Sequence, residues 1–420
     1  MKRKAAALIT VLLITLLLII SFLFVKAIIE TPWRQWSISS TRVPTYIITG
    51  SVASAYDRGY AVVQTTDGGY AIGGLWNDHG WKPHSGGVSN YTGVIIKTDA
   101  AGRVKWEKTL NKGRTGIYPE AIIQTSDSGF LVNCGIEVFK LDAEGNIQWS
   151  KWFENLYIES VIQAGDGSYV FVGWGDNNRN SVLFKTDDEG NQVWNETVGF
   201  ESKYTFLRVV TKASDGGYVA AGTWDYSLLL IKTSVNGTIQ LTRTYDFGIE
   251  KGQVMPPTNV ALCKTKDGGY ILAGGLRYDN HYYPWIYKLD SEGNLQWNQT
   301  YDDGGRFVSV VQIANGDYVA AGEYFLVEDD GALMVKTDEF GKIEWNAKYW
   351  EKGTYHDNEA SSVIATADGG FAVVGTLDDS IWLAKFAPES AVSELLSFIA
   401  VWVTVTVGVG LLVYFKKRKQ

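Results

Sequence analysis

Short apolar runs alternate with polar turns along most of the chain, and one pair of runs recurs nearly unchanged. In KLDSEGNLQW (Lys288–Trp297) an apolar run leads into a glycine turn, and the following run places tryptophan four residues after that glycine. This pattern predicts a β-hairpin whose second strand packs a large ring against its neighbours. The other copies are KTDAAGRVKW (Lys97–Trp106), KLDAEGNIQW (Lys140–Trp149), KTDDEGNQVW (Lys185–Trp194), KTDEFGKIEW (Lys336–Trp345) and the degenerate KTSVNGTIQL (Lys232–Leu241).

A second motif is an Asp-Gly or Asn-Gly turn followed by an aromatic residue. Such turns between apolar runs predict hairpins, because both central residues tolerate positive φ. The aromatic residues recur roughly every 50 residues, which is typical of repeat architectures. They are Tyr70, Phe130, Tyr169, Tyr218, Tyr270, Tyr318 and Phe371. Four residues after each aromatic stands a glycine, or Cys134 in one copy, so we expect close backbone approach there.

Each unit is expected to contain four short antiparallel strands, as in ALCKT, YILAGG, PWIYKLD and NLQWNQTY of the fifth unit. Such units, repeated around an axis, predict an all-β fold, a seven-bladed β-propeller of four-stranded antiparallel blades. A right-handed β-helix is the alternative, although its coils are usually shorter and lack hairpin turns. The propeller therefore explains the repeats better.

The last unit lacks a fourth strand, and a segment ahead of the first unit is expected to supply it. Val43–Thr49 fits this role because its spacing to the first Asp-Gly turn matches that of the fourth strands elsewhere. Trp33–Ser39 competes with it, because Trp36 mimics the tryptophan of the repeat. Either pairing would close the ring and remove exposed sheet edges.

Uncharged apolar runs lie near both chain ends, at Ala5–Val25 and Leu395–Phe415, and each is long enough to cross a bilayer as a helix. Basic residues at both tips favour cytoplasmic termini and an extracellular body, although the first run could instead be a cleaved secretory signal. The expected parts are 1–29 (transmembrane signal or anchor), 30–42 (linker), 43–388 (propeller), 389–394 (linker), 395–415 (transmembrane helix) and 416–420 (basic tail).

Composition narrows the classes of partner. The formal net charge is −8 although both tips are basic, so the body is acidic and nucleic-acid binding is disfavoured. The two cysteines, Cys134 and Cys263, cannot form a disulfide framework, so the core must hold the fold. An exported body would also carry candidate N-glycosylation sites. These are Asn90, Asn195, Asn236 and Asn298.

The KxDxxGxxxW hairpin resembles the tryptophan-docking repeat of quinoprotein-type propellers and the Asp-box hairpin of sialidases. Together with the DGGY turn it is similar to repeat propellers on the surfaces of archaea and bacteria. The resemblance covers roughly residues 43–387 and implies the propeller fold. The quinoprotein repeat has one more residue between its Asp and Gly, and its enzymes carry adjacent cysteines. Sialidases need an arginine cluster that this sequence lacks. Neither chemistry is expected here, and no cofactor is expected.

Binding residues are expected in the loops opposite the Asp-Gly turns, which are long and varied, above all residues 75–93 and 276–285. Aromatic rings there stand beside carboxylates and amides, a combination that can bind sugars or peptides, although such rings can also simply pack on one another. The candidate ligand-binding residues are Trp76, Asp78, His79, Trp81, Trp174, Asp176, Trp224, Asp225, Arg277, Tyr278, Asp279, Tyr282 and Tyr324.

Evidence for catalysis or metal binding is weak. All four histidines fall in these loops, but their spacing does not predict a metal site. The hairpin acids recur in most units, which indicates turn chemistry rather than a single active site. Three functions therefore remain: a membrane-anchored module that binds an envelope glycan, peptide or protein; a glycan-active or quinoprotein-like enzyme; and a structural surface-layer component. Buried polar groups clustered at the mouth of the central channel would favour an enzyme.

Overall fold

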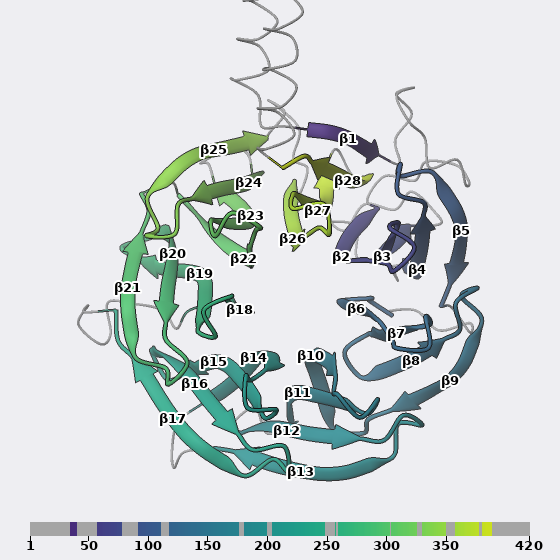
Figure 1. Cartoon of the computed structure of the whole chain (residues 1–420), viewed down its shortest axis with the longest axis horizontal. Helices are drawn as coiled ribbons and strands as arrows, with labels where there is room; N and C mark the ends of the chain where they lie inside the picture. The colour runs from purple at the N-terminus through teal and green to yellow at the C-terminus, as the bar shows by residue number, and fades with distance from the viewer. Residues whose placement is uncertain are drawn as a thin grey trace, which may run out of the picture.

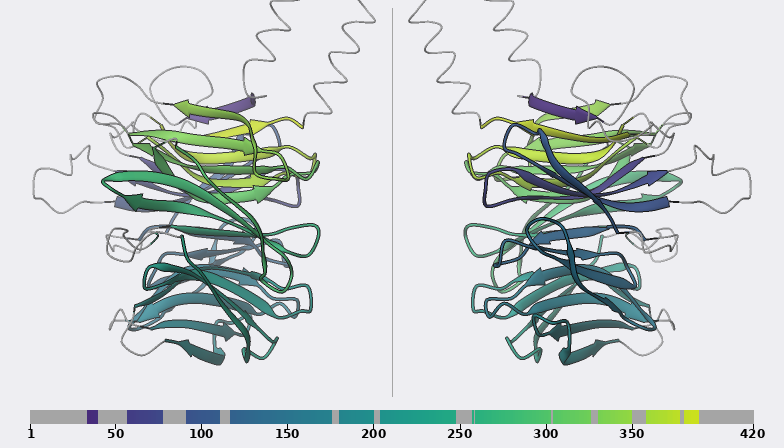
Figure 2. Two further views of the ribbon diagram at one scale, coloured as in Figure 1. Left: turned by 90° about the vertical axis from the view of Figure 1, so that its left-hand side faces the viewer. Right: turned by 90° about the vertical axis from the view of Figure 1, so that its right-hand side faces the viewer.

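Every Asp-Gly turn and every hairpin predicted from the sequence joins two neighbouring strands in the computed structural model. The strands form seven four-stranded antiparallel sheets, arranged as blades around a central axis (Figure 1). Figure 2 shows the ring from its edge. The structure describes residues 57–77, 91–110, 117–175, 180–199, 204–247, 257, 259–302, 304–325, 330–349, 358–377 and 380–388, and the backbone of 34–39.

Each blade runs from an innermost to an outermost strand. The innermost strands are β2 (Arg58–Gln64), β6 (Ala121–Gln124), β10 (Leu156–Gln163), β14 (Thr205–Lys212), β18 (Val260–Lys264), β22 (Gly305–Gln312) and β26 (Glu359–Ala365). The second strands are β3 (Tyr70–Asn77), β7 (Phe130–Asn133), β11 (Tyr169–Gly175), β15 (Tyr218–Trp224), β19 (Tyr270–Tyr278), β23 (Tyr318–Phe325) and β27 (Phe371–Leu377).

The outer half of each blade follows the same order. The third strands are β4 (Tyr91–Thr98), β8 (Glu137–Leu141), β12 (Ser181–Thr186), β16 (Ser227–Thr233), β20 (His281–Leu289), β24 (Asp330–Thr337) and β28 (Ser380–Phe386). The outermost strands are β5 (Val104–Thr109), β9 (Ile147–Trp152), β13 (Gln192–Val198), β17 (Ile239–Tyr245), β21 (Leu295–Thr300), β25 (Ile343–Tyr349) and β1 (Arg34–Ser39).

The acid of the hairpin motif caps its own turn. In the first blade one carboxylate oxygen of Asp99 accepts hydrogen bonds from the backbone amides of Ala101 and Arg103, both at 2.9 Å. Gly102 between them has a φ of 78°, which favours glycine. In the degenerate fourth copy the hydroxyl of Ser234 replaces the carboxylate. The recurring acids therefore serve turn geometry, as the sequence indicated.

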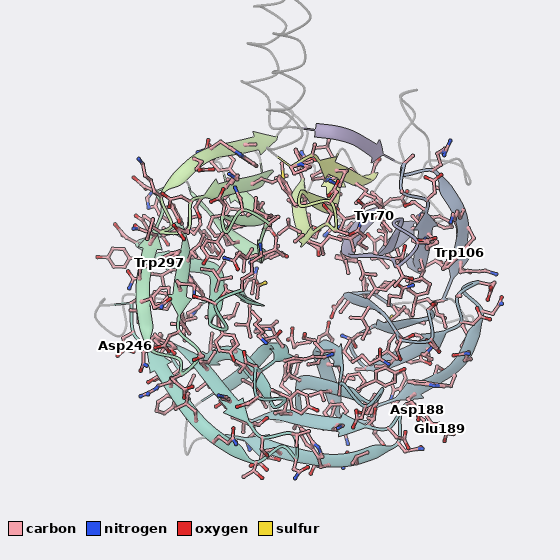
Figure 3. All side chains as sticks on the ribbon, viewed as in Figure 1. Tyr70, Trp106, Asp188, Glu189, Asp246 and Trp297 are labelled. Carbon is pink, nitrogen blue, oxygen red and sulfur yellow. The ribbon has the colours of Figure 1, made fainter. Side chains whose placement is uncertain are left out.

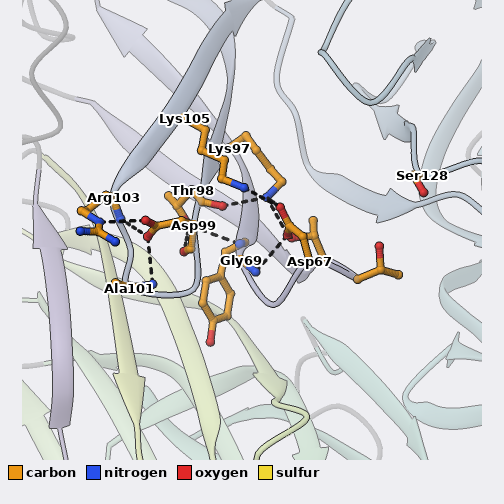
Figure 4. A network of polar contacts seen from close by, with 12 residues as sticks. Asp67, Gly69, Lys97, Thr98, Asp99, Ala101, Arg103, Lys105 and Ser128 are labelled. Atoms are coloured by element: carbon orange, nitrogen blue, oxygen red, sulfur yellow. Dashed lines mark hydrogen bonds and ion pairs between the residues drawn. The ribbon is translucent and has the colours of Figure 1, made fainter.

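In every blade a lysine of the third strand pairs with an aspartate at the first turn; in the sixth blade this is Asp317, directly after the Asn-Gly pair. Figure 4 shows the pair in the first blade, where Lys97 Nζ lies 3.0 Å from Asp67 Oδ1. Lys105 from the outer strand joins the same carboxylate at 2.8 Å. The other six pairs are Lys140–Asp127, Lys185–Asp166, Lys232–Asp215, Lys288–Asp267, Lys336–Asp317 and Lys385–Asp368. Each pair ties the third strand of its blade to the first turn.

The repeated tryptophan joins neighbouring blades. Trp106 of the first blade lies 5.9 Å, between ring centroids, from Phe130 of the second, and Trp297 lies 5.9 Å from Tyr318. Both tryptophans lie toward the outer rim (Figure 3). The hairpin glycine of the next blade seats this ring: a Cβ on Gly341 would fall 2.6 Å from the Trp297 ring. The expected role of the tryptophan is confirmed.

The fourth blade lacks this tryptophan and has Leu241 in its place. From the same strand the hydroxyl of Tyr245 donates a 2.5 Å hydrogen bond to the carbonyl of Gly293 in the next blade. A polar contact thus joins blades four and five where the usual ring is missing. The hydrophobic core lies between adjacent blades, as where Leu230 packs with Leu272 and Trp285.

The glycine four residues after each aromatic admits the backbone of the innermost strand. A Cβ on Gly222 would fall 1.8 Å from the carbonyl oxygen of Phe206, and one on Gly322 would fall 1.9 Å from that of Arg306. Beside these glycines the innermost strands carry a β-bulge, for example between Leu207 and Val209. The predicted close approach is confirmed, and the approaching group is the adjacent strand of the same blade.

The ring is closed by β1, which pairs antiparallel with β28 from Arg34↔Phe386 to Ser39↔Trp382. Of the two closing segments predicted from the sequence, Trp33–Ser39 contains the strand that pairs, Arg34–Ser39, and Val43–Thr49 lies outside the described residues. This strand falls in the segment 30–42 that the sequence suggested as a linker. A further link joins the blades that meet there: Gln64 Oε1 accepts a 2.8 Å hydrogen bond from the amide of Ala367.

Within the described ranges no helix is long and apolar enough to span a membrane. The apolar runs Ala5–Val25 and Leu395–Phe415 both lie outside those ranges. Membrane anchoring therefore stays a prediction from the sequence.

Candidate functional site

The loops expected to bind a ligand connect the second and third strands of each blade, on the face opposite the Asp-Gly turns; we call it the loop face. Four of the predicted residues lie outside the described residues: Asp78, His79, Trp81 and Asp176. The structure places the other nine at the loop-face ends of their strands. These are Trp76, Trp174, Trp224, Asp225, Arg277, Tyr278, Asp279, Tyr282 and Tyr324.

Several predicted residues have structural roles at these positions. Asp225 has a φ of 55° in the two-residue turn between β15 and β16, and Asp279 has a φ of 49° in the turn between β19 and β20. Aspartate tolerates this left-handed conformation better than most residues do. Trp76 and Trp224 are half-buried and pack against the cores between blades. Turn geometry and packing therefore account for these four residues.

One group of predicted residues assembles between blades five and six. The Arg277 guanidinium lies 5.5 Å from the ring centroid of Tyr282, whose ring centroid lies 4.7 Å from that of Phe325. The Arg306 guanidinium lies 5.5 Å from the ring centroid of Phe325 and donates hydrogen bonds to both carboxylate oxygens of Glu323. Cations and rings thus alternate along this edge of the loop face.

A second group, not predicted from the sequence, lies on the innermost strands. In the first, third and fourth blades these residues stand at the β-bulge of the innermost strand, where the alternation of side chains between the two faces is interrupted. In the second blade the residue stands just before β6. Adjacent blades contribute Tyr60, Glu120, Glu159 and Arg208 at this position, in chain order. The innermost strands surround the axis, so these four residues belong to blades that follow one another around it (Figure 1).

Side chains of blades two, three and four form two hydrogen-bonded groups here, and the stacked rings of Tyr157 and Trp174 connect the two groups. The hydroxyl of Tyr157 donates to Glu120 Oε1. Arg208 Nη1 pairs with Glu159 Oε1 at 2.5 Å, and the indole of Trp174 donates to the same oxygen at 2.8 Å. We call these five residues the inner-strand cluster. Trp174 is the only one of them that the sequence pointed to.

The electrostatics of the cluster centre on Glu120. Burial, with a smaller contribution from the neighbouring charge of Glu159, raises the pKa of Glu120 to about 7. Burial and the nearby Glu120 also raise the pKa of the Tyr157 hydroxyl, which therefore stays a proton donor. Burial likewise raises the pKa of Tyr60, which lies in the fields of Arg58, Glu359 and Glu120. Near neutral pH, Glu120 can thus gain or lose a proton while its neighbour donates.

A row of aromatic rings leads from this cluster to the surface. Tyr157 stacks on Trp174 at 5.2 Å between centroids, Trp174 meets Phe206 edge-on at 6.3 Å, and Phe206 stacks on Tyr204 at 6.3 Å. Tyr204 is 56% exposed. The Arg208 guanidinium lies 5.5 Å from the Phe206 ring centroid. We call the four rings the aromatic row; they offer a ligand both apolar faces and adjacent charges.

No metal site emerges in the described part of the chain, where no three acidic, histidine or cysteine side chains come together. His281 is exposed, with Nδ1 2.8 Å from the carbonyl of Asp279. Cys134 and Cys263 are both free thiols, and burial raises the pKa of each. Their environment favours packing over reactivity.

Of the four glycosylation candidates, Asn195, Asn236 and Asn298 are exposed on or beside outermost strands. Asn90 lies outside the described residues. Exposure makes these three side chains accessible for modification, which itself stays a prediction.

A groove of about 690 Å³ lies on the opposite face, between blades five and six. Trp297 and the exposed Phe340 form its apolar part. Its polar lining is largely engaged within the protein, because Lys288 pairs with Asp267 and Gln312 bonds to the amide of Lys266. The groove therefore offers a ligand fewer available polar groups than the loop face does.

Comparison with known proteins supports the fold. No protein-family model matches the sequence, and no curated protein matches it. Among solved structures it is similar to a streptogramin B lyase, with a TM-score of 0.53 and 13% identity over 85% of this chain and 100% of that one. A catalytically inactive virginiamycin B lyase from Staphylococcus aureus, with quinupristin, is also similar. Its TM-score is 0.53 and its identity is 13%, over 80% of this chain and 97% of that one.

The Dos1 propeller is a third similar structure, with a TM-score of 0.50 and 9% identity over 85% of this chain and 95% of that one. At such identities a likeness shows the fold alone. The chain is a seven-bladed β-propeller. Its likeness to quinoprotein-type and surface repeat propellers rests on the KxDxxGxxxW and DGGY motifs and stays a resemblance.

The inner-strand cluster left one signal in the sequence. Three of its members, Glu120, Glu159 and Arg208, stand seven residues before the aspartate of the next Asp-Gly turn, and so does Tyr60 of the first blade. An alignment of the repeats would have shown this column as mostly polar between apolar columns. The contacts between its members depend on the ring, which places neighbouring blades side by side.

Proposed function

We propose that the protein is a membrane-anchored extracellular β-propeller that acts as a binding module at the cell surface. Its partner is an envelope glycan, a peptide or a neighbouring envelope protein. The terminal apolar runs with their basic flanks support anchoring with both termini in the cytoplasm. Tags on both termini should then be protected when protease is added to intact cells, and degradation of the C-terminal tag would contradict this orientation.

The observation that carries the binding proposal is the aromatic row. Four rings from two blades lie edge to face or stacked beside Glu159 and Arg208, and the outermost ring, Tyr204, is exposed. Aromatic faces bind the apolar faces of sugars and side chains, while adjacent charges and amides fix the orientation of the ligand. The cation–ring series at Arg277, Tyr282 and Phe325 extends such a surface to blades five and six.

The test is a glycan and peptide array probed with the full-length protein in detergent. Truncating a central aromatic contact typically weakens binding by about tenfold or more, so Trp174→Ala and Tyr204→Ala should each lose signal. Trp152→Ala is the matched control, because it removes a 53% exposed tryptophan from the outer rim. Equal binding by all three variants, or no binding by the wild-type protein, would contradict the proposal.

The pair Glu120–Tyr157 favours a second function, an enzyme acting on surface glycans as a hydrolase or lyase. A carboxyl group with a pKa of about 7 next to a hydroxyl donor is suited to general acid–base catalysis. Incubation of array-positive glycans with the protein should then give cleaved products, and Glu120→Gln should abolish cleavage while the binding that depends on Trp174 persists. Intact glycans after incubation with wild-type protein would exclude this function.

A further inference from the structure

We propose that the inner-strand cluster binds a primary ammonium group of the ligand, and that the carboxylate of Glu120 receives it. This inference rests on the proposed binding function of the loop face and names the chemical group that the ligand presents. A lysine side chain and an amino sugar are two sources of such a group.

Among the described residues, no cation forms an ion pair with Glu120. Within the described residues its side chain makes one hydrogen bond, from the Tyr157 hydroxyl. The cation that acts on it is Arg208, whose guanidinium is already paired with Glu159. Ionising a carboxylate that is removed from water and has no counter-ion costs free energy. A ligand cation beside the carboxylate would offset this cost, so its binding would be favoured.

The side chains near Glu120 are largely aromatic. Tyr157 donates a hydrogen bond to the Glu120 carboxylate, and burial, with smaller contributions from Glu120 and Tyr118, raises the pKa of Tyr60. The ring of Tyr118 in turn lies 6.4 Å from that of Tyr91. Aromatic faces attract cations, most strongly where water is partly excluded. Carboxylate and rings together therefore suit an organic cation.

The hydrogen bonding indicates which cation fits. Tyr157 already uses one lone pair of Glu120 Oε1, so a guanidinium that made its two preferred parallel bonds would have to share that oxygen with the hydroxyl. A compact ammonium needs a single oxygen and can direct its other protons elsewhere. Hard metal ions need several oxygen ligands, and the described residues bring no three metal-ligating side chains together. A primary ammonium group is the best match.

The site should bind its cation in a pH-dependent way. The ligand favours ionised Glu120, so affinity rises with pH through about 7 and levels off above it. Between pH 6 and 8 the ionised fraction, and with it the affinity, grows about tenfold, while a lysine ammonium stays charged. Burial raises the pKa of three facing groups, which stay protonated in this range: Tyr60, Cys134 and Tyr157. The remaining facing charges, Glu159 and Arg208, pair with each other.

The experiment is calorimetric titration of the full-length protein in detergent with Nα-acetyl-lysine amide and with Nα-acetyl-norleucine amide, which lacks only the ammonium group. We expect the lysine compound to bind at least tenfold more tightly at pH 8, with proton release near pH 7. Glu120→Gln should remove both the preference and the pH dependence. Glu154→Gln is the matched control, because Glu154 is exposed on the turn before β10, on the same face.

Tyr157→Phe keeps the carboxylate but removes a hydrogen bond that lowers its pKa, so the midpoint of the pH dependence should move to higher pH. Glucosamine with N-acetylglucosamine as its neutral pair forms a second arm. Preference for glucosamine over the lysine compound would support the ammonium site and identify an amino sugar as its source. Equal binding of charged and neutral compounds in both arms would overturn the inference. Array binding that depends on Trp174 would then still stand, and the two proposals fail separately.

Discussion

Replacing Asp267 by asparagine should destabilise the propeller more than replacing its partner Lys288 by methionine. The Lys288 side chain is 5% exposed, whereas that of Asp267 is 53% exposed. Lys288 Nζ donates to Asp267 Oδ2 at 2.7 Å and to the carbonyl of Leu289 at 3.0 Å. Asparagine keeps an oxygen for the turn amide of Gly269 but leaves a buried ammonium unpaired. Methionine removes the buried charge and leaves an aspartate that water can solvate.

The magnitudes follow from this asymmetry. Stranding a buried charge costs about 3 kcal/mol, whereas losing hydrogen bonds to a solvated carboxylate costs about 1 kcal/mol. The double variant should resemble Lys288→Met alone, because it contains no stranded charge. Asp99→Asn is the control, because its partner Arg103 is 81% exposed, and it should destabilise the protein less than Asp267→Asn does.

Guanidinium unfolding of the full-length protein, followed by the fluorescence of its 16 tryptophans, measures these differences. The reasoning is refuted if Lys288→Met destabilises as much as Asp267→Asn. It is also refuted if the costs of the two single changes simply add in the double variant.

Three further predictions concern the same framework. Gly341→Ala should cost at least about 1 kcal/mol more in unfolding free energy than Gly167→Ala. Both glycines have positive φ, but only a Cβ on Gly341 would lie against the Trp297 ring. Equal costs would show that the ring moves aside. Gln64→Ala should cost about 1 kcal/mol and speed amide exchange in the first and last blades, with the fourth blade as the unchanged internal control. Acid should weaken the Lys–Asp pairs, because hydrogen bonds lower the pKa of Asp166 to about 2. The contribution of Asp166 to the unfolding free energy is therefore complete above pH 4 and is lost toward pH 2. An unfolding free energy that stays constant over this range would contradict the prediction.

The repeats themselves made most of the fold predictable. KLDSEGNLQW predicted a hairpin, a turn cap and a ring between blades, and all three are present. Each depends on neighbours within a few residues or on a contact that recurs in every unit. The Lys–Asp pair was not foreseen, although both residues belong to the recognised motifs, because their side chains meet only when the first and third strands lie in one blade.

The candidate site was predicted only in part. The loops pointed to Trp174, Arg277 and Tyr282, whereas Asp225 and Asp279 proved to be turn residues. Glu120 and Glu159 escaped attention because Glu120 directly precedes an otherwise ordinary strand, Glu159 stands within one, and neither lies next to a turn signal. Their significance comes from partners in neighbouring blades.

The sequence by itself determined the number of blades and the chemistry of their turns, because these follow from short-range hydrogen bonding and from the period of the apolar residues. Only the tertiary structure decided which segment closes the ring and which polar side chains meet around the axis. Both depend on contacts between residues far apart in the chain: β1 pairs with β28, and Tyr157 reaches Glu120 from another blade. Local preference leaves such pairings open, and closure of the ring selects among them.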